Sequence, residues 1–341
     1  MSGSLVPEPS RLASVPVMKA AVYYETGPPD VLRYEEVPDP VCGPGDVLID
    51  VEAVSIEGGD TLNRAGGDMS TTPHIVGYQC AGVVAEVGTD VTDRSVGQRV
   101  VASFLEGSHA ERRAVPALVT WVVPDGLDIG EAACVPIAFG TADDCLFEFG
   151  HLQAGETVLI QAGASGVGLA AIQLAKRAGA TVLATASSDE KLERLRDFGL
   201  DHGINYRGIN DAAVDFASAA RDLTGGRGVD LVVDSVGSTL TGSVQALAYR
   251  GRCTLVGQAG RDPQPFDAAM LMGQNLTLTG VFFGAEIITE RVQAMVTRHL
   301  DDVAAGRLQV VIDRTFPLAE AADAHAYLES RQAFGRVVLV P

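Results

Sequence analysis

The chain has 341 residues, of which 25 are Lys or Arg and 44 are Asp or Glu, so its formal net charge at pH 7 is −19. Hydrophobic residues make up 47% of the chain, which excludes a disordered protein. The excess of negative charge disfavours nucleic acids and anionic membrane surfaces as partners. At roughly 150 residues per domain, the length predicts two domains, each large enough to bury its own core.

The N-terminal residues and the cysteines indicate the cellular compartment of the protein. Residues 1–17 lack the apolar core of a signal peptide, and we expect them to be a leader or a disordered tail. No segment approaches the roughly 18 continuous apolar residues of a membrane span. The five cysteines are scattered, without a Cys-x-x-Cys pair, which argues against a disulfide framework or a Cys-rich zinc site. We therefore predict a cytoplasmic protein with reduced thiols and no membrane partner.

The first part of the chain has the pattern of a β-rich domain. Between Met18 and residue 136, runs of strand length rich in β-branched residues alternate with Gly- and Pro-containing turns. The clearest of these runs are 18–25, 46–56, 81–88 and 98–104. This pattern predicts a barrel-like domain with few helices.

The pattern changes near residue 137, where buried strands begin to alternate with helices. Residues 157–161 read as a short apolar strand, 164–178 as a helix that ends at Gly179, and 180–186 as a second strand. Further strands are expected at 229–237, 253–258 and 276–283. Alternation of this kind predicts an α/β fold with a doubly wound parallel sheet.

The end of the chain returns to the strand pattern of the first part. We expect a helix within 287–306 and a final strand within 334–341 that joins the first domain. The predicted domains are therefore 18–136 together with 285–341, and 137–284.

A glycine-rich loop joins the first strand of the second domain to its helix. Binding a dinucleotide pyrophosphate requires a tight turn, a backbone without Cβ obstruction, and helix amides that point at the phosphates. Two registers fit, Gly166-x-Gly168-x-x-Ala171 and Gly163-x-Ser165-x-x-Gly168. The strand before the loop, and the helix and strand after it, favour a dinucleotide site over an ordinary Gly-rich turn. The predicted cofactor-binding residues of the loop are Gly163, Ala164, Ser165, Gly166, Val167 and Gly168.

The residues about 20 positions beyond the loop distinguish NAD from NADP, because NAD enzymes place an acid there on the ribose 2′-hydroxyl. Here Ser187 occupies that position, and Lys191 follows one helical turn later. A hydroxyl and an ammonium group suit a 2′-phosphate, which a carboxylate would repel. Asp189 and Glu190 fit the N-terminal turn of the next helix. We predict NADP(H), although Lys191 also fits the description of a solvent-exposed helix lysine.

Several motifs in a fixed order, spread from Met18 to Pro341, extend this interpretation. They include MKAAVYYETGPPDVL, VGYQCAGVVAEVG, VLIQAGASGVGLAAIQLAK, TGGRGVDLVVDSVG and LESRQAFGRVVLVP. With these motifs the chain resembles the zinc-free medium-chain dehydrogenases/reductases of the quinone oxidoreductase (zeta-crystallin-like) family. The resemblance implies a GroES-like β-rich domain, formed by both ends of the chain, and a Rossmann domain. It also implies a homodimer formed through the edge strand within 276–283.

The resemblance implies further cofactor contacts. Tyr206 and Arg331 would surround the 2′-phosphate together with Lys191, although Tyr206 could instead cap a strand and Arg331 could be a surface cation. The resemblance implies that the nicotinamide ribose and the nicotinamide ring are contacted by Thr141, Ser235, Gly257, Phe282 and Phe283.

Zinc can be judged at the positions where zinc-dependent relatives hold it. Those relatives use a Cys shortly before an Asp, a Gly-His-Glu segment and a later Cys or Asp. Here the first segment, 55–60, contains no Cys, and the second, 77–79, reads Gly-Tyr-Gln. The four-Cys structural lobe is also absent between Gln98 and Val115. Without thiolate or imidazole ligands a zinc site is chemically improbable, and we predict a zinc-free protein.

The candidate catalytic residues lie in the same segments. Tyr78, at the former zinc-histidine position, could donate a hydrogen bond to a carbonyl oxygen as charge develops there, or could only pack between the domains. Asp60 and Asn63 are further polar candidates, and Asp60 could be a turn residue. Quinone oxidoreductases often have Asn and Tyr where this chain has Glu57 and Leu62, which alters the lining of the substrate site.

We expect hydride transfer from NADPH to a quinone, with hydrogen-bond donors in the place of a metal. The altered lining keeps a second function open, the reduction of an enone or enoyl double bond on the same scaffold. A third possibility belongs to another class, an NADPH-binding structural or sensor protein without turnover, because a fold alone does not define a function. In the first two cases the partner is a small conjugated carbonyl compound.

Overall fold

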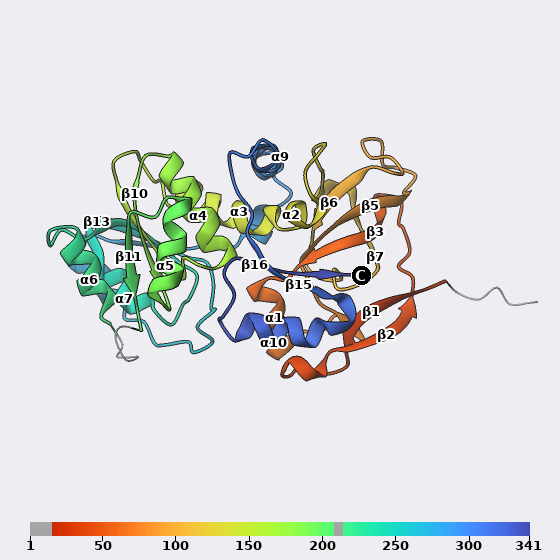
Figure 1. Ribbon diagram of the computed structural model, residues 1–341, viewed down its shortest axis with the longest axis horizontal. Coiled ribbons are helices and arrows are strands. Elements are labelled where there is room, and N and C mark those ends of the chain that lie inside the picture. The colour runs from red at the N-terminus through yellow and green to blue at the C-terminus, as the bar shows by residue number, and fades with distance from the viewer. Residues whose placement is uncertain (1–15, 208–213) are drawn as a thin grey trace, which may run out of the picture.

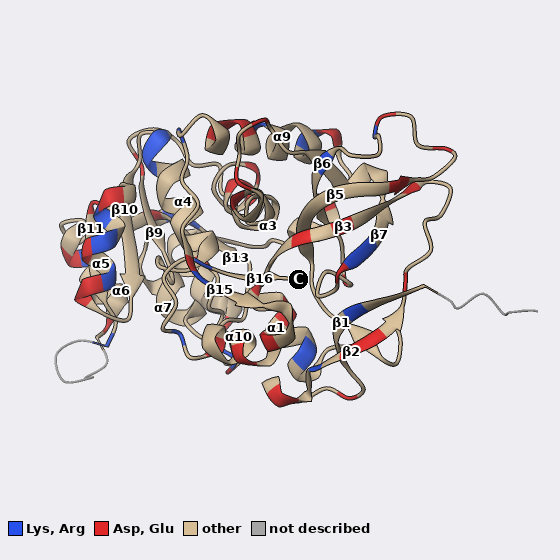
Figure 2. Cartoon of the chain, turned by 45° about the vertical axis from the view of Figure 1, so that its right-hand side comes forward, with Lys and Arg blue, Asp and Glu red and all other residues tan. Residues whose placement is uncertain are grey.

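The computed structural model describes residues 16–207 and 214–341, which form two lobes (Figure 1). Of the predicted leader, 1–17, only Pro16 and Val17 lie within the described residues, and Val17 is the first residue of a strand. No helix of the described residues is both long and apolar enough to cross a membrane. Acidic and basic residues occur along the ribbon of both lobes (Figure 2).

The elements follow the predicted change from strands to alternating strands and helices. The strands are β1 (Val17–Tyr23), β2 (Arg33–Pro38), β3 (Asp46–Ser55), β4 (His74–Ile75), β5 (Gln79–Val87), β6 (Arg99–Ser103), β7 (Arg112–Pro116), β8 (Thr120–Val122), β9 (Thr157–Ile160), β10 (Thr181–Ala186), β11 (His202–Asn205), β12 (Val229–Asp234), β13 (Leu247–Leu255), β14 (Thr277–Gly280), β15 (Ile312–Pro317) and β16 (Arg336–Val340). The helices are α1 (Gly58–Gly66), α2 (Ile129–Ala133), α3 (Val135–Asp143), α4 (Gly166–Arg177), α5 (Asp189–Leu195), α6 (Phe216–Leu223), α7 (Leu240–Gln245), α8 (Phe283–Glu286), α9 (Glu290–Ala304) and α10 (Ala321–Glu329).

The β-rich lobe combines strands from both ends of the chain. β1 pairs with β2 and β4, and a second sheet has the order β15-β16-β3-β5-β6-β8, with β7 also on β3. β16 runs antiparallel to β3, with Leu339 opposite Val54. The last strand of the chain therefore lies in the same sheet as strands from its first part. The boundaries 18–136, 137–284 and 285–341 stay a prediction.

The other lobe contains a six-stranded sheet with the order β11-β10-β9-β12-β13-β14. Every pairing in this sheet is parallel. The chain order reverses at β9, since β10 and β11 lie on one side of it and β12 to β14 on the other. This arrangement is a doubly wound sheet, whose switch point lies between β9 and β12. The predicted α/β fold is confirmed.

An apolar core connects the two lobes. It continues from the β-rich sheet through α3 to α4 and β9, with Phe139 of α3 and Leu169 of α4 among its buried residues. α3 packs against both α4 and α9, and it lies between the lobes in Figure 1. Because buried apolar surface is the main stabilising contribution in such contacts, this helix holds the two lobes against each other.

Candidate active site

The glycine loop connects β9 to α4 at the switch point of the sheet. A Cβ on Gly163 would lie 2.8 Å from the Cβ of Ala184, in the neighbouring strand. Ser165 caps α4, because its hydroxyl accepts a hydrogen bond of 3.1 Å from the Gly168 amide. A Cβ on Gly168 would lie 2.4 Å from the carbonyl oxygen of Ala162. Gly168, which belongs to both registers, is the position of close backbone approach, whereas Gly163 and Gly166 both meet side chains, so both registers stay open.

The C-terminal part of the chain forms a wall of this loop. The Gly335 amide donates a hydrogen bond of 2.8 Å to the carbonyl oxygen of Ala164, and Gly335 forms a parallel bridge with Ser165. Gly166 and Val167 are the first two residues of α4, where amide groups attract anions, and Gly166 packs against the Arg336 side chain.

The four residues predicted around a 2′-phosphate come together at one corner of the sheet. Ser187 follows β10 and Tyr206 follows β11, and the Tyr206 amide donates to the carbonyl oxygen of Ala186 at 3.1 Å. In the first turn of α5, the Lys191 ammonium group donates to the carbonyl oxygen of Arg331 at 2.9 Å. Burial lowers the pKa of Lys191. This corner therefore combines a hydroxyl, a phenol and two cations.

The residues predicted near the nicotinamide follow the other parallel strands. Ser235 and Gly257 are neighbours, since a Cβ on Gly257 would lie 2.6 Å from the carbonyl oxygen of Ser235. The buried Phe283 ring packs on Gly140, next to Thr141 in α3. Phe282, by contrast, is 65% exposed. Apart from Thr141 and Arg331, the predicted cofactor residues all follow the carboxyl ends of strands, which is where open α/β sheets bind ligands.

Tyr78 and Asn63 form the polar pair on the other side of the crevice. The Tyr78 ring lies over Gly59 of α1, where a Cβ would come within 2.3 Å of its Cε2 atom. The Asn63 side-chain amide donates a hydrogen bond of 3.0 Å to the Tyr78 oxygen. A phenol that accepts one hydrogen bond retains its own proton for a further acceptor. Burial raises the pKa of Tyr78, and the charge of Asp60 adds to that shift, so the phenol is protonated at neutral pH.

The side chain of Asp60, unlike that of Tyr78, is completely buried. One carboxylate oxygen accepts from the Tyr78 amide at 3.1 Å, and the other accepts from the Glu57 amide at 2.8 Å. Burial raises the pKa of Asp60 to about 8. Of the three candidate catalytic residues, Tyr78 and Asn63 contact each other, whereas Asp60 fastens the start of α1 to the segment just before β5 that contains Tyr78.

A buried ion pair occupies the segment where zinc-dependent relatives have a cysteine. The Arg336 guanidinium donates to both oxygens of the Glu57 carboxylate, one of them at 3.0 Å, and to the Ser55 hydroxyl at 3.0 Å. The Gln79 amide donates to the same carboxylate. Burial raises the pKa of Glu57, and the charge of Arg336 opposes that shift.

These residues do not fit a zinc ion. The carboxylate of Glu57 is already bound by a cation, Tyr78 is a protonated phenol and Gln79 is a neutral amide, so none supplies the thiolate or imidazole that zinc prefers. Within residues 16–207 and 214–341, no group of three or more His, Cys, Asp or Glu side chains is arranged to hold a metal.

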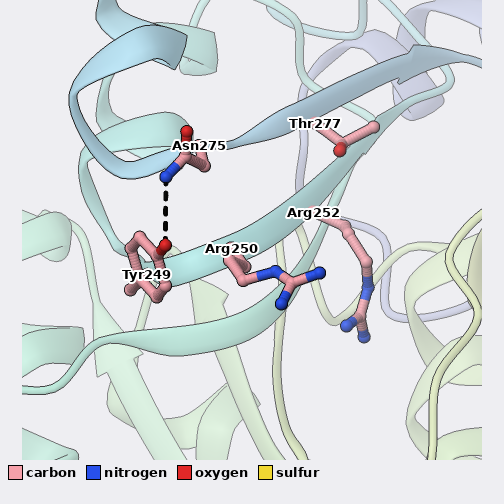
Figure 3. Close-up of a pocket in the computed structure, with 5 residues that line it drawn as sticks. All are labelled: Tyr249, Arg250, Arg252, Asn275 and Thr277. Carbon is pink, nitrogen blue, oxygen red and sulfur yellow. Dashed lines mark hydrogen bonds between the residues drawn. The ribbon is translucent and has the colours of Figure 1, made fainter.

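A large open cavity, of about 690 Å³, lies away from this crevice (Figure 3). It adjoins the amino ends of β13 and β14, whereas the predicted cofactor residues follow the carboxyl ends. The side chains that line it are Tyr249, Arg250, Arg252, Asn275 and Thr277. Because these are the opposite ends of the parallel sheet, we do not assign this cavity to the active site.

Sequence reasoning missed Arg336. Its signal was available, since it is the first residue of an apolar strand and a charged side chain in such a strand needs a buried partner. Arg261, which follows β13, was also missed, and its loop carries no pattern that would identify a contact with the other lobe.

A β-rich lobe, together with a doubly wound sheet that carries a capped glycine loop at its switch point, is typical of a two-domain dinucleotide-dependent dehydrogenase or reductase. Family models support this class. The alcohol dehydrogenase GroES-like domain matches residues 43–125, and the zinc-binding dehydrogenase domain matches residues 166–301. The chain belongs to the zinc-free quinone oxidoreductase family of medium-chain dehydrogenases/reductases, and it is an oxidoreductase.

Individual relatives match over almost the whole chain. The 2-haloacrylate reductase of Burkholderia sp. is 35% identical over 344 residues, which cover 95% of this chain and 99% of the relative. A mycobacterial protein whose structure was solved in complex with NADPH is 36% identical, with a TM-score of 0.88 over 95% of this chain and 100% of the relative. Escherichia coli quinone oxidoreductase, also solved with NADPH, is 26% identical, with a TM-score of 0.89 over the same shares of the two chains.

Proposed function

We propose that the protein is a cytoplasmic, zinc-independent enzyme that uses NADPH to reduce a carbon–carbon double bond conjugated to a carbonyl group. The observation that carries the proposal is the protonated Tyr78 phenol, which Asn63 orients from α1. That helix contacts the loop that follows β13, because the Thr61 hydroxyl accepts a hydrogen bond from Arg261, four residues after Gly257. The phenol and the predicted nicotinamide contacts therefore belong to elements that touch.

NADPH is the proposed cofactor on the basis of the residues around the glycine loop. The loop and the N-terminus of α4 would hold the pyrophosphate. Ser187, Lys191, Tyr206 and Arg331 would hold the 2′-phosphate, and two similar structures were solved with NADPH. The cofactor supplies the hydride when it is bound.

The protein's own residues manage the charge that develops on the substrate. Tyr78 donates a hydrogen bond to the carbonyl oxygen, where negative charge accumulates when a hydride adds to the β-carbon of the substrate. The resulting enolate takes the second hydrogen, a proton at its α-carbon, from water. Asn63 fixes the phenol oxygen, so that the proton of Tyr78 is directed to the substrate. Asp60 holds the backbone at Tyr78 and the start of α1 in register. The carbonyl group of a conjugated substrate needs less polarisation than that of an isolated ketone. The neutral Tyr78 phenol, held by Asn63, therefore suits a conjugated substrate.

The comparisons support two substrate classes. The 2-haloacrylate reductase is named for a compound whose double bond is conjugated to a carboxylate, which supports enones and enoic acids as the first class. Similarity to E. coli quinone oxidoreductase across the whole chain supports quinones as the second. We place quinones second because Glu57 and Leu62 stand where quinone oxidoreductases often have Asn and Tyr.

Replacing Tyr78 by Phe tests the role of the phenol. We expect Tyr78→Phe to lower kcat for an enone by about 10²-fold or more, the usual contribution of a general acid, with an unchanged dissociation constant for NADPH. Tyr249→Phe, in the remote cavity, is the matched control and should keep full activity. A Tyr78→Phe enzyme as active as the control would show that the phenol only packs between the lobes.

A further inference from the structure

A side chain from the Rossmann lobe crosses the crevice and contacts the other lobe. Arg261 lies in the loop after β13, and its guanidinium donates to the Thr61 hydroxyl at 2.5 Å. The same nitrogen lies 3.1 Å from a carboxylate oxygen of Glu329, at the end of α10. One side chain thus connects β13, α1 and α10.

Glu329 is shared by two arginines from different lobes. Arg64, one turn after Thr61 on α1, donates to the same carboxylate oxygen that Arg261 approaches. The side chain of Arg64 is 1% exposed, that of Glu329 22% and that of Arg261 34%. Because these charges are largely withdrawn from water, their attraction is screened less than that of an ordinary surface ion pair.

The backbone of the loop is adapted to this contact. Arg261 has a φ of 58°, in the left-handed region that a non-glycine residue adopts at an energetic cost. The preceding residue, Gly260, is held from two sides, since its amide donates to the carbonyl oxygen of Val236 and its own carbonyl accepts from Arg331 at 3.3 Å. The loop is therefore fixed in the conformation that aims Arg261 at α1.

The contact joins the two halves of the proposed reaction. Gly257, a predicted nicotinamide contact, is four residues before Arg261 in the same loop. Asn63, which orients Tyr78, is two residues after Thr61 in the same helix. Hydride donor and hydrogen-bond donor thus stand on different lobes, and a misplacement of about 1 Å between reacting groups can lower a rate by about 10²-fold.

We propose that Arg261 is a positioning residue that sets α1, and with it the Asn63–Tyr78 pair, against the nicotinamide end of the cofactor site. It acts through Thr61 and Glu329 and does not touch the substrate. The expected effect of Arg261 on the rate of hydride transfer rests on the proposed function. Its expected effect on the stability of α1 rests only on its contacts with Thr61 and Glu329.

The test compares Arg261→Ala with Arg250→Ala. Arg250 is an arginine of the same lobe with a similar backbone, φ 62°, at the remote cavity. We expect Arg261→Ala to lower the single-turnover rate of hydride transfer by about 10- to 100-fold, with the dissociation constant of NADPH unchanged. Amide hydrogen exchange in 58–66 should become faster in Arg261→Ala, with and without NADPH, and stay at the wild-type rate in Arg250→Ala. Thr61→Val, which removes only the hydroxyl acceptor, should change both quantities in the same direction by less.

Three outcomes would overturn the proposal. One is unchanged hydrogen exchange in α1 of Arg261→Ala and Thr61→Val. Another is faster exchange in α1 together with a wild-type rate of hydride transfer. The third is a loss of NADPH affinity large enough to account for the lower rate, which would make Arg261 a cofactor contact. If the wild-type enzyme reduces no acceptor, the proposed function fails, while hydrogen exchange still decides whether Arg261 holds α1.

Discussion

We propose that single side chains at the corner formed by β10, β11 and the segment after α10 decide between NADPH and NADH. Lys191 is the central one, because it reaches Arg331 through the carbonyl oxygen of that residue. Its ammonium group therefore contributes a charge and holds the backbone at Arg331, whose own guanidinium donates to the carbonyl oxygen of Gly260.

We expect Lys191→Ala to lower the preference for NADPH over NADH by about 10- to 100-fold, the effect of losing a charge-assisted hydrogen bond of about 1.5 to 3 kcal/mol. The ratio of kcat/KM for the two cofactors measures this preference. Lys176→Ala is the control, since that lysine is paired with Asp201 on the surface of the same lobe. An unchanged ratio in Lys191→Ala would mean that the lysine only contacts the backbone at Arg331 and does not bind the cofactor.

Two elements of the β-rich lobe meet through a pair of buried histidines. The Nε2 atoms of His109 and His325 lie 3.0 Å apart, so one ring donates and the other accepts, which requires the accepting ring to be neutral. Burial lowers the pKa of His109 to about 3, with the charge of Arg113 adding to the shift. Burial also lowers the pKa of His325 well below its usual value, and His109, Arg64 and Arg261 add to that shift.

These pKa values predict how stability depends on pH. Below about pH 6.5 the unfolded chain protonates both histidines and the folded chain does not, so each contributes a loss of about 1.4 kcal/mol per pH unit as the pH falls. Asp60 acts in the opposite sense, because its raised folded pKa makes it lose stability as the pH rises toward about 8. We expect the free energy of unfolding, measured in urea, to be greatest near pH 6.5. A value that still rises between about pH 6.5 and 8 would contradict this balance.

At the scale of elements, local sequence signals were sufficient to predict a feature where its interacting residues are neighbours in the sequence. The glycine loop was predictable because strand, loop and helix follow one another in the sequence, and the structure adds the bond by which Ser165 caps α4. Glu57 and Arg336 are 279 residues apart in sequence, and only the pairing of β16 with β3 brings them together. The Arg261–Thr61 contact likewise depends on how the two lobes meet, which no local pattern encodes.

At the scale of the whole molecule, β14 is an edge strand of the Rossmann sheet among the residues that the structure describes. β14 pairs with β13 on one side and is the last strand of the sheet order. Exposed strand edges favour pairing with another chain, and we propose that two copies associate through β14. Light scattering at micromolar concentration should give twice the mass of the chain. A monomer at that concentration would show that the edge is covered in another way.

The central claim is that the crevice between the lobes reduces conjugated carbonyl compounds with NADPH and without a metal. The direct measurement is the oxidation of NADPH by EDTA-treated enzyme, with enones and enoic acids, quinones, and simple ketones as parallel acceptors, and with NADH as the alternative cofactor. We predict turnover with enones or enoic acids above that with quinones, little with simple ketones, and a preference for NADPH. Binding of NADPH without oxidation by any acceptor would contradict the claim and identify the protein as a cofactor-binding protein without turnover.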